Sequence, residues 1–144
     1  MDHIKDLLQF LDNSPVNFLA TETICQRLVD AGFERLNACE KLDNIKPGRQ
    51  FFFTKNDSSV YAFRIGSEPL SEAGFHVICA HCDSPTFRIK PNAEMTGEGG
   101  IVRLNTEVYG GPILSTWFDR PLTIAGRVIV RSEDVMCPVT KLLH

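Results

Sequence analysis

The sequence has few features that would mark a membrane, secreted or nucleic-acid-binding protein. No run in its 144 residues approaches the ~18 apolar residues that are needed to span a bilayer. The amino terminus carries acidic residues and no following apolar stretch, so we expect no secretory signal. The formal net charge is -3 and no basic stripe is present, which argues against non-specific nucleic-acid binding. We therefore expect neither a membrane nor a nucleic acid as partner.

Cysteine usage does not suggest a disulfide framework. The five cysteines are odd in number and irregularly spaced: Cys25, Cys39, Cys79, Cys82 and Cys137. This pattern is typical of reduced thiols, and it predicts a cytoplasmic protein. The sequence also lacks a G-x-S-x-G motif, a phosphate-binding loop and a dinucleotide fingerprint, so those three kinds of catalytic or binding site are not indicated.

The first third of the chain has the periodicity of helices. One stripe at i, i+3, i+4 and i+7 spacing consists of Ile4, Leu7, Leu8 and Leu11. Ser14 and Pro15 are expected to break this helix and to begin the next, with Ser14 as its cap. A second stripe consists of Phe18, Thr21, Cys25, Leu28 and Val29, and Gly32 is expected to end it. We expect both stripes to pack in the core.

From residue 49 the pattern becomes that of β-structure. Residues 49–54 and 60–65 are strand-like and flank turn-forming residues 55–59, which predicts a hairpin. Residues 67–73 are expected to form a loop. Residues 75–80 are nearly all apolar, as in a strand buried on both faces. This strand ends at a polar cluster, where open α/β sheets place ligand sites.

A second, β-rich unit is predicted to begin near residue 93. Before it, residues 86–90 are expected to be extended and Pro91 to close them. Glycines then separate three short β-like runs, at residues 101–104, 113–116 and 122–130. These strands are too few to bury both faces, so we expect this unit to be incomplete. The predicted division is therefore residues 1–92 and residues 93–144.

The best chemical candidate is the pair His81 and Asp83. In an extended segment, residues i and i+2 point to the same side. Neutral imidazole is a good zinc ligand, and a neighbouring carboxylate can take the other ring N–H and fix its orientation. A competing hypothesis treats Cys79 and Cys82 as a C-x-x-C redox pair, but the helix that such a pair needs does not follow it.

Two stretches resemble the signatures of one enzyme family. Residues 80–85 read Ala-His-Cys-Asp-Ser-Pro and are followed by Arg-Ile-Lys-Pro at 88–91. Residues 109–122 read Tyr-Gly-Gly-Pro-Ile-Leu-Ser-Thr-Trp-Phe-Asp-Arg-Pro-Leu and are followed by Ala-Gly-Arg-Val at 125–128. Both resemble the aspartyl aminopeptidase family of zinc metallopeptidases, and flanking pieces agree over nearly the whole chain. The departures are Leu19 for the commoner His, Cys82 for Thr and Pro121 for an acid.

The resemblance implies an α/β fold. It would consist of a partial zinc-peptidase-like mixed sheet with helices, followed by the start of a β-rich oligomerisation domain. It also implies two zinc ions, with His81 as a metal ligand and Asp83 as the catalytic-site residue that orients it. The remaining ligands and the general base would follow residue 144. Glu94, Glu98 and Glu107 match no ligand position, and Asp119 belongs to the β-rich part.

The predicted function is zinc-dependent removal of amino-terminal residues, often acidic ones, from peptide substrates by a homo-oligomer. Residues 1–144 would be inactive alone, because one imidazole cannot hold a zinc ion that needs about four donors. The alternative is a non-catalytic interaction module that pairs through its β-rich part, because unpaired strand edges favour association.

Overall fold

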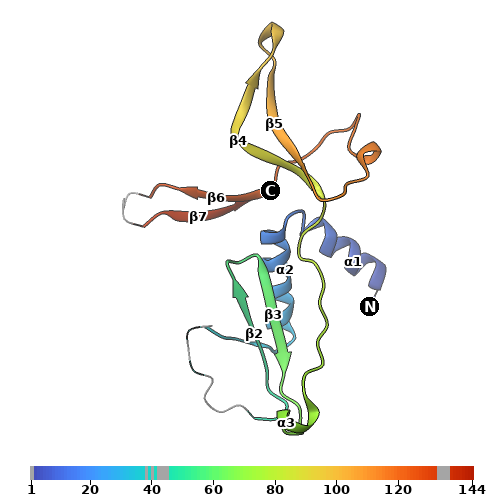
Figure 1. Cartoon of the computed structure of the whole chain (residues 1–144), viewed down its shortest axis with the longest axis vertical. Helices are drawn as coiled ribbons and strands as arrows, with labels where there is room; N and C mark the ends of the chain where they lie inside the picture. Colours follow the sequence, from blue (N-terminus) through green and yellow to red (C-terminus); the bar gives the residue numbers. More distant parts are fainter. Residues whose placement is uncertain (1, 38, 40, 42–45, 133–136) are drawn as a thin grey trace. The chain divides into compact units, whose positions relative to one another are not determined.

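The computed structural model describes residues 2–37, 39, 41, 46–132 and 137–144. The chain forms two compact units, which are described separately below. Unit 1 consists of Met1–Asp83 together with Ile124–His144, and unit 2 consists of Ser84–Thr123. Helices and small sheets occur together, as predicted for a mixed α/β chain (Figure 1). The expected boundary between residues 92 and 93 stays a prediction.

Unit 1 begins with the two predicted helices, α1 (His3–Asp12) and α2 (Asn17–Asp30). The side chain of Asp2 caps α1 by accepting a hydrogen bond from the backbone N–H of Lys5. The expected cap at Ser14 is wrong: α2 begins after Val16, which provides no side-chain cap. As expected, Gly32 follows the end of α2, where its φ of 82° suits a residue without a side chain.

The two helices are joined through their polar sides. The Arg27 guanidinium of α2 donates hydrogen bonds of 3.1 and 3.0 Å to the two carboxylate oxygens of Asp6 on α1, and it lies over the Phe10 ring. The predicted core packing of the first apolar stripe is wrong, because all four of its side chains are more than half exposed. In the second stripe Thr21 is buried, but Val29 is exposed.

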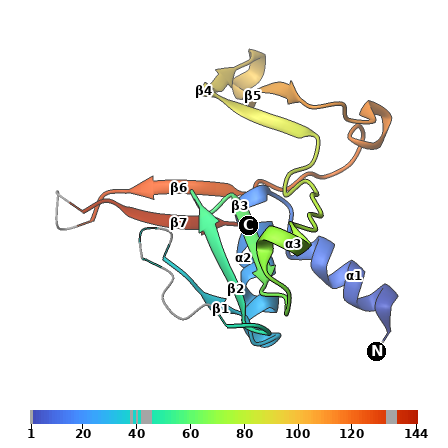
Figure 2. The ribbon, with the colours of Figure 1, turned by 60° about the horizontal axis from the view of Figure 1, so that its bottom comes forward.

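The predicted hairpin is confirmed as β2 (Gln50–Lys55) and β3 (Ser59–Arg64). It pairs antiparallel, and the short strand β1 (Glu34–Arg35) adds parallel to β2. Ala20 and Thr21 of α2 are buried together with Phe51 and Phe52 of β2, and α2 contacts both strands of the hairpin (Figure 2). This contact is the core of unit 1.

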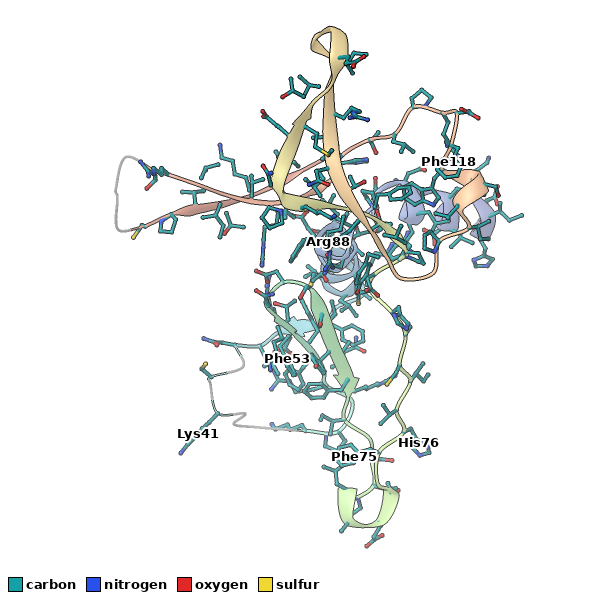
Figure 3. The ribbon with its side chains drawn as sticks, turned by 45° about the horizontal axis from the view of Figure 1, so that its top comes forward. Lys41, Phe53, Phe75, His76, Arg88 and Phe118 are labelled. Atoms are coloured by element: carbon teal, nitrogen blue, oxygen red, sulfur yellow. The ribbon has the colours of Figure 1, made fainter. Side chains whose placement is uncertain are left out.

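Residues 75–80 do not form the predicted buried strand. They follow the one-turn helix α3 (Leu70–Ala73), which lies in the expected loop, and no strand pairing in the described chain includes them. Phe75 and Ile78 are 81% and 98% exposed. Figure 3 shows Phe75 and His76 in this segment. A strand buried on both faces needs neighbours at both edges and a layer on each face. Among the described residues, no strand pairs with residues 75–80 and no layer covers Phe75 or Ile78.

Unit 2 contains a long antiparallel pair, β4 (Thr86–Thr96) and β5 (Val102–Tyr109), connected through the 3-10 turn η1 (Glu98–Gly100). The expectation that Pro91 closes the first strand is wrong. The register shifts between Ile89 and Glu94, so Pro91 lies where the ladder of hydrogen bonds is interrupted. A residue without an N–H is tolerated at such an irregularity.

The other two β-like runs have different outcomes. Residues 113–116 are not a strand, because the 3-10 turn η2 (Leu114–Thr116) occupies them and Thr116 Oγ1 donates to the Ile113 carbonyl at 2.7 Å. The run at 122–130 becomes strand only in β6 (Gly126–Val130), which returns to unit 1 and pairs antiparallel with β7 (Val139–Leu143). No helix among the described residues is long and apolar enough to cross a bilayer.

We expect Phe52 to be the most sensitive position in unit 1, because its side chain is fully buried. Phe52→Ala should lower the free energy of unfolding by about 3–5 kcal/mol, through lost apolar burial and the cavity that remains. Phe75→Ala, the same substitution at an exposed position, should change it by less than about 0.5 kcal/mol. Urea unfolding followed by circular dichroism measures both, and equal losses would contradict this assignment of the core.

Candidate functional site

The structure places His81 and Asp83 at the end of the exposed segment 75–80. His81 Nδ1 lies 2.9 Å from Asp83 Oδ1. An ionised carboxylate can only accept, so Nδ1 carries the proton and donates it to Asp83. The lone pair of the imidazole is then on Nε2, and the His81 side chain is 90% exposed. The pair therefore presents one oriented, solvent-accessible nitrogen, Nε2, whose lone pair can bind a metal ion.

This geometry fits one arm of a zinc site. A metal-bound histidine usually donates its other ring N–H to a carboxylate or carbonyl, which fixes the ring and makes the donor nitrogen more basic. A zinc ion takes about four donors. Among the residues that the structure describes, no group of three or more His, Cys, Asp or Glu side chains is placed to hold a metal ion. The roles of His81 as ligand and of Asp83 as orienter stay predictions.

Thiol chemistry at the same segment has little geometric support. All five cysteines are free thiols, with Cys79 exposed and Cys82 partly exposed. Three residues of extended backbone span about 10 Å, whereas a disulfide needs Cα atoms within about 7 Å. A bond between Cys79 and Cys82 would thus require this segment to fold back on itself.

Cys25 of α2 has an environment opposite to that of a reactive thiol. Burial raises the pKa of its thiol, the Arg35 guanidinium lowers it, and the carboxylates of Asp57 and Glu22 raise it further. A raised pKa leaves less thiolate at neutral pH, and the thiolate is the nucleophile. Cys25 therefore acts as a packing residue.

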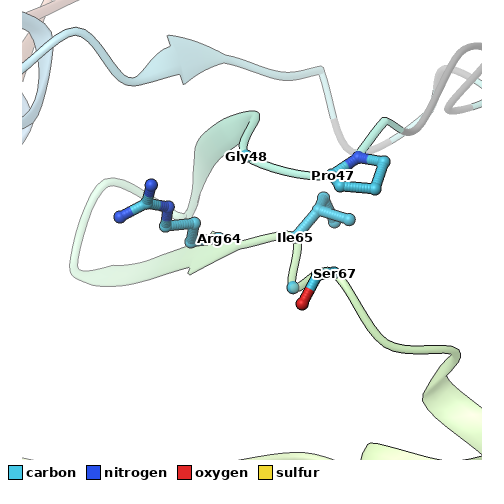
Figure 4. A pocket seen from close by; sticks show the side chains of 6 residues that line it. Pro47, Gly48, Arg64, Ile65 and Ser67 are labelled. Atoms are coloured by element: carbon cyan, nitrogen blue, oxygen red, sulfur yellow. The ribbon is translucent and has the colours of Figure 1, made fainter.

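The acidic residues of unit 2 do not assemble into a second site. Glu94, Glu98 and Glu107 lie on or beside β4 and β5, and Asp119 follows η2 with a φ of 55°. The described part of the chain shows no metal-binding group among them. An open pocket in unit 1 has no metal ligand among its lining residues, which are Pro47, Gly48, Arg64, Ile65, Gly66 and Ser67 (Figure 4).

Comparison with known proteins gives a consistent result. The sequence pattern of the family described as aminopeptidase I zinc metalloprotease (M18) matches residues 10–141. A probable M18 family aminopeptidase 2 of Clostridium novyi (strain NT) is 52% identical over 140 residues, which cover 97% of this chain and 32% of that protein. The chain thus spans about a third of the length of the curated relatives that it matches.

Solved structures agree with this match. One match is a chain in the cryo-EM structure of the Ape4 and Nbr1 complex, with a TM-score of 0.88 and 37% identity. The match covers 96% of this chain and 26% of the chain in that complex. The mApe1 dodecamer of S. cerevisiae has a TM-score of 0.86 and 24% identity, covering 98% of this chain and 33% of its own. The second likeness concerns the fold alone. Together these matches confirm the predicted partial peptidase fold.

The raised pKa of Cys25 gives a testable order of thiol reactivity. With iodoacetamide at pH 8, we expect Cys25 to react more slowly than the exposed Cys79, and its pH midpoint to lie above that of free cysteine. Asp57→Asn removes a charge that raises this pKa, so it should speed alkylation of Cys25. Asp12→Asn, an exposed control, should not. Peptide mass spectrometry measures each rate, and faster labelling of Cys25 than of Cys79 would contradict the assignment.

Proposed function

Because the chain belongs to the aminopeptidase I zinc metalloprotease family, M18, we propose that it contributes part of the active site of a zinc-dependent aminopeptidase. The observation that carries this proposal is the hydrogen-bonded pair His81 and Asp83 within the span that matches the family. The complete enzyme would remove amino-terminal residues from peptides. We propose acidic residues as its preferred substrates, which the resemblance to the aspartyl aminopeptidases supports.

The described residues have one defined task in this reaction. Asp83 holds the Nδ1 proton of His81 and so directs Nε2 outward as a metal donor. Zinc, when bound, supplies Lewis-acid chemistry that activates water and polarises the scissile carbonyl. We propose a site of two ions, as the family resemblance implies. The further donors and the general base would come from residues outside this 144-residue sequence.

The proposal extends to assembly and location. One solved structure of similar fold is a dodecamer, and unit 2 of this chain exposes apolar side chains on both strands of its hairpin, among them Met95, Val102 and Val108. These observations support a homo-oligomer. The five free thiols support a reducing compartment such as the cytoplasm.

The catalytic proposal predicts that residues 1–144 alone hydrolyse no aminoacyl-arylamide substrate, because they supply a single oriented imidazole. The complete product of the native gene should hydrolyse such substrates and lose activity with a chelator. Its intact mass, measured by mass spectrometry, should exceed 16.1 kDa. A mass near 16.1 kDa with a discrete oligomer on size exclusion would instead support the non-catalytic interaction module.

Substitutions in the complete enzyme separate the two proposed roles. His81→Ala should abolish activity, because it removes a donor of the site. Asp83→Asn keeps the shape but weakens the orienting bond, so zinc affinity should fall about 10- to 100-fold. His76→Ala changes another exposed histidine of the same segment and should leave kcat/KM unchanged. Zinc titration and steady-state kinetics measure these effects, and full activity of His81→Ala would refute the assignment.

A further inference from the structure

One arginine connects three parts of unit 1 that are far apart in the sequence. Arg127 lies on β6, and its Nη1 donates hydrogen bonds to Asn56 O at 2.9 Å and to Asn56 Oδ1 at 3.3 Å. Its Nη2 also donates to Asn56 Oδ1, at 3.3 Å. The guanidinium carbon lies 4.1 Å from the centre of the Phe18 ring on α2. The Arg127 side chain of β6 thus contacts both α2 and the turn between β2 and β3.

The acceptor of these bonds belongs to a rigid turn. Asn56 and Asp57 have φ values of 54° and 51°, and Ser58 N donates to Lys55 O at 3.2 Å. Two successive left-handed residues make a type I′ turn, which Asn and Asp tolerate better than other residues with a side chain. Thr54 Oγ1 also donates to the Asp57 carboxylate at 3.0 Å. The turn therefore presents Asn56 to Arg127 in a fixed orientation.

The place of Arg127 in the chain gives these contacts their significance. Unit 1 is built from two segments, Met1–Asp83 and Ile124–His144, and all of unit 2 is inserted between them. Arg127 lies just after the point where the chain returns, and its bonds to Asn56 span 71 positions of the sequence. The contact between Arg127 and Asn56 thus ties the returning segment to the first one.

The hairpin of β6 and β7, which follows the chain's return to unit 1, buries little apolar surface. All four buried residues described in unit 1 lie on α2 and β2, whereas Ile129 of β6 is 71% exposed and Leu143 of β7 is 48% exposed. The hairpin projects away from α2 in both ribbon views (Figures 1 and 2). A two-stranded hairpin is marginally stable without a packed face. Its attachment to unit 1 therefore depends strongly on contacts such as those of Arg127.

We propose that Arg127 is a latch that holds the β6–β7 hairpin to the α2–β2–β3 core and that can open while this core stays folded. The strength of the latch comes from the planar fork that reaches Asn56 while stacking on Phe18.

Hydrogen exchange of the 144-residue chain, followed by mass spectrometry, tests the latch. Arg127→Ala should speed exchange in residues 126–130 and 139–143 by about tenfold, the loss expected for charge-assisted bonds and a cation–π contact at a partly exposed site. Exchange in β2 and β3 should change by less than about twofold, because opening is local. Arg131→Ala removes the same charge from the following loop and should change neither region.

Arg127→Lys provides the second test, because it keeps the charge and is expected to fold. Lysine lacks the planar fork, so exchange in β6 and β7 should still rise, by less than in Arg127→Ala. Unchanged exchange in β6 and β7 of both variants would overturn the proposal. It would also be overturned by an equal rise in β2 and β3, which would make Arg127 a contributor to global stability instead of a latch.

Discussion

Unit 1 depends on the packing of one hydrophobic strand against one helix. The described residues that are buried are Phe51 and Phe52 of β2 and Ala20 and Thr21 of α2. Within the hairpin, Phe53 of β2 stacks on Tyr61 of β3 with ring centres 4.8 Å apart. Cross-strand aromatic pairs add modestly to the stability of a sheet. The other elements of unit 1 attach to this core mainly by polar contacts, as Arg27 does for α1 and Arg127 for β6.

The candidate site lies outside this core, and that explains its partial character. His81 and Asp83 follow a segment whose apolar side chains face solvent, so their mutual orientation rests on one hydrogen bond between residues two apart. Such a local pair needs no surrounding fold to be made. Its ability to bind a metal tightly is a different matter, because the remaining donors must be held at fixed distances by other elements. The relatives are about three times as long as this chain.

Elements whose signals are local were predictable from the sequence. The hairpin followed from two strand-like runs and the Asn56–Asp57 turn, and the pairing of His81 with Asp83 followed from their spacing. Elements that depend on distant partners were not. Residues 75–80 have the composition of a buried strand, but composition reports the environment that a segment suits and not the neighbours present. The expectation that Pro91 ends a strand failed for a related reason. The irregular register between Ile89 and Glu94 removes the need for the N–H that proline lacks, so β4 continues through it.

The Phe-rich hairpin and the apolar stripe of α1 also differ in whether a distant partner covers them. Both are strongly patterned, yet the hairpin finds its partner in α2 whereas the stripe of α1 remains exposed. An amphipathic helix gains most of its stability from burying its apolar face. Here α1 is instead retained by the cap at Asp2, at its amino-terminal end, and by the bidentate bond from Arg27 to Asp6 on its polar side.

The apolar stripe of α1 and segment 75–80 thus share one feature: each has an apolar surface that the described residues leave uncovered. Both surfaces belong to unit 1, which also carries the candidate metal ligand. Covering both surfaces would require additional elements packed against unit 1.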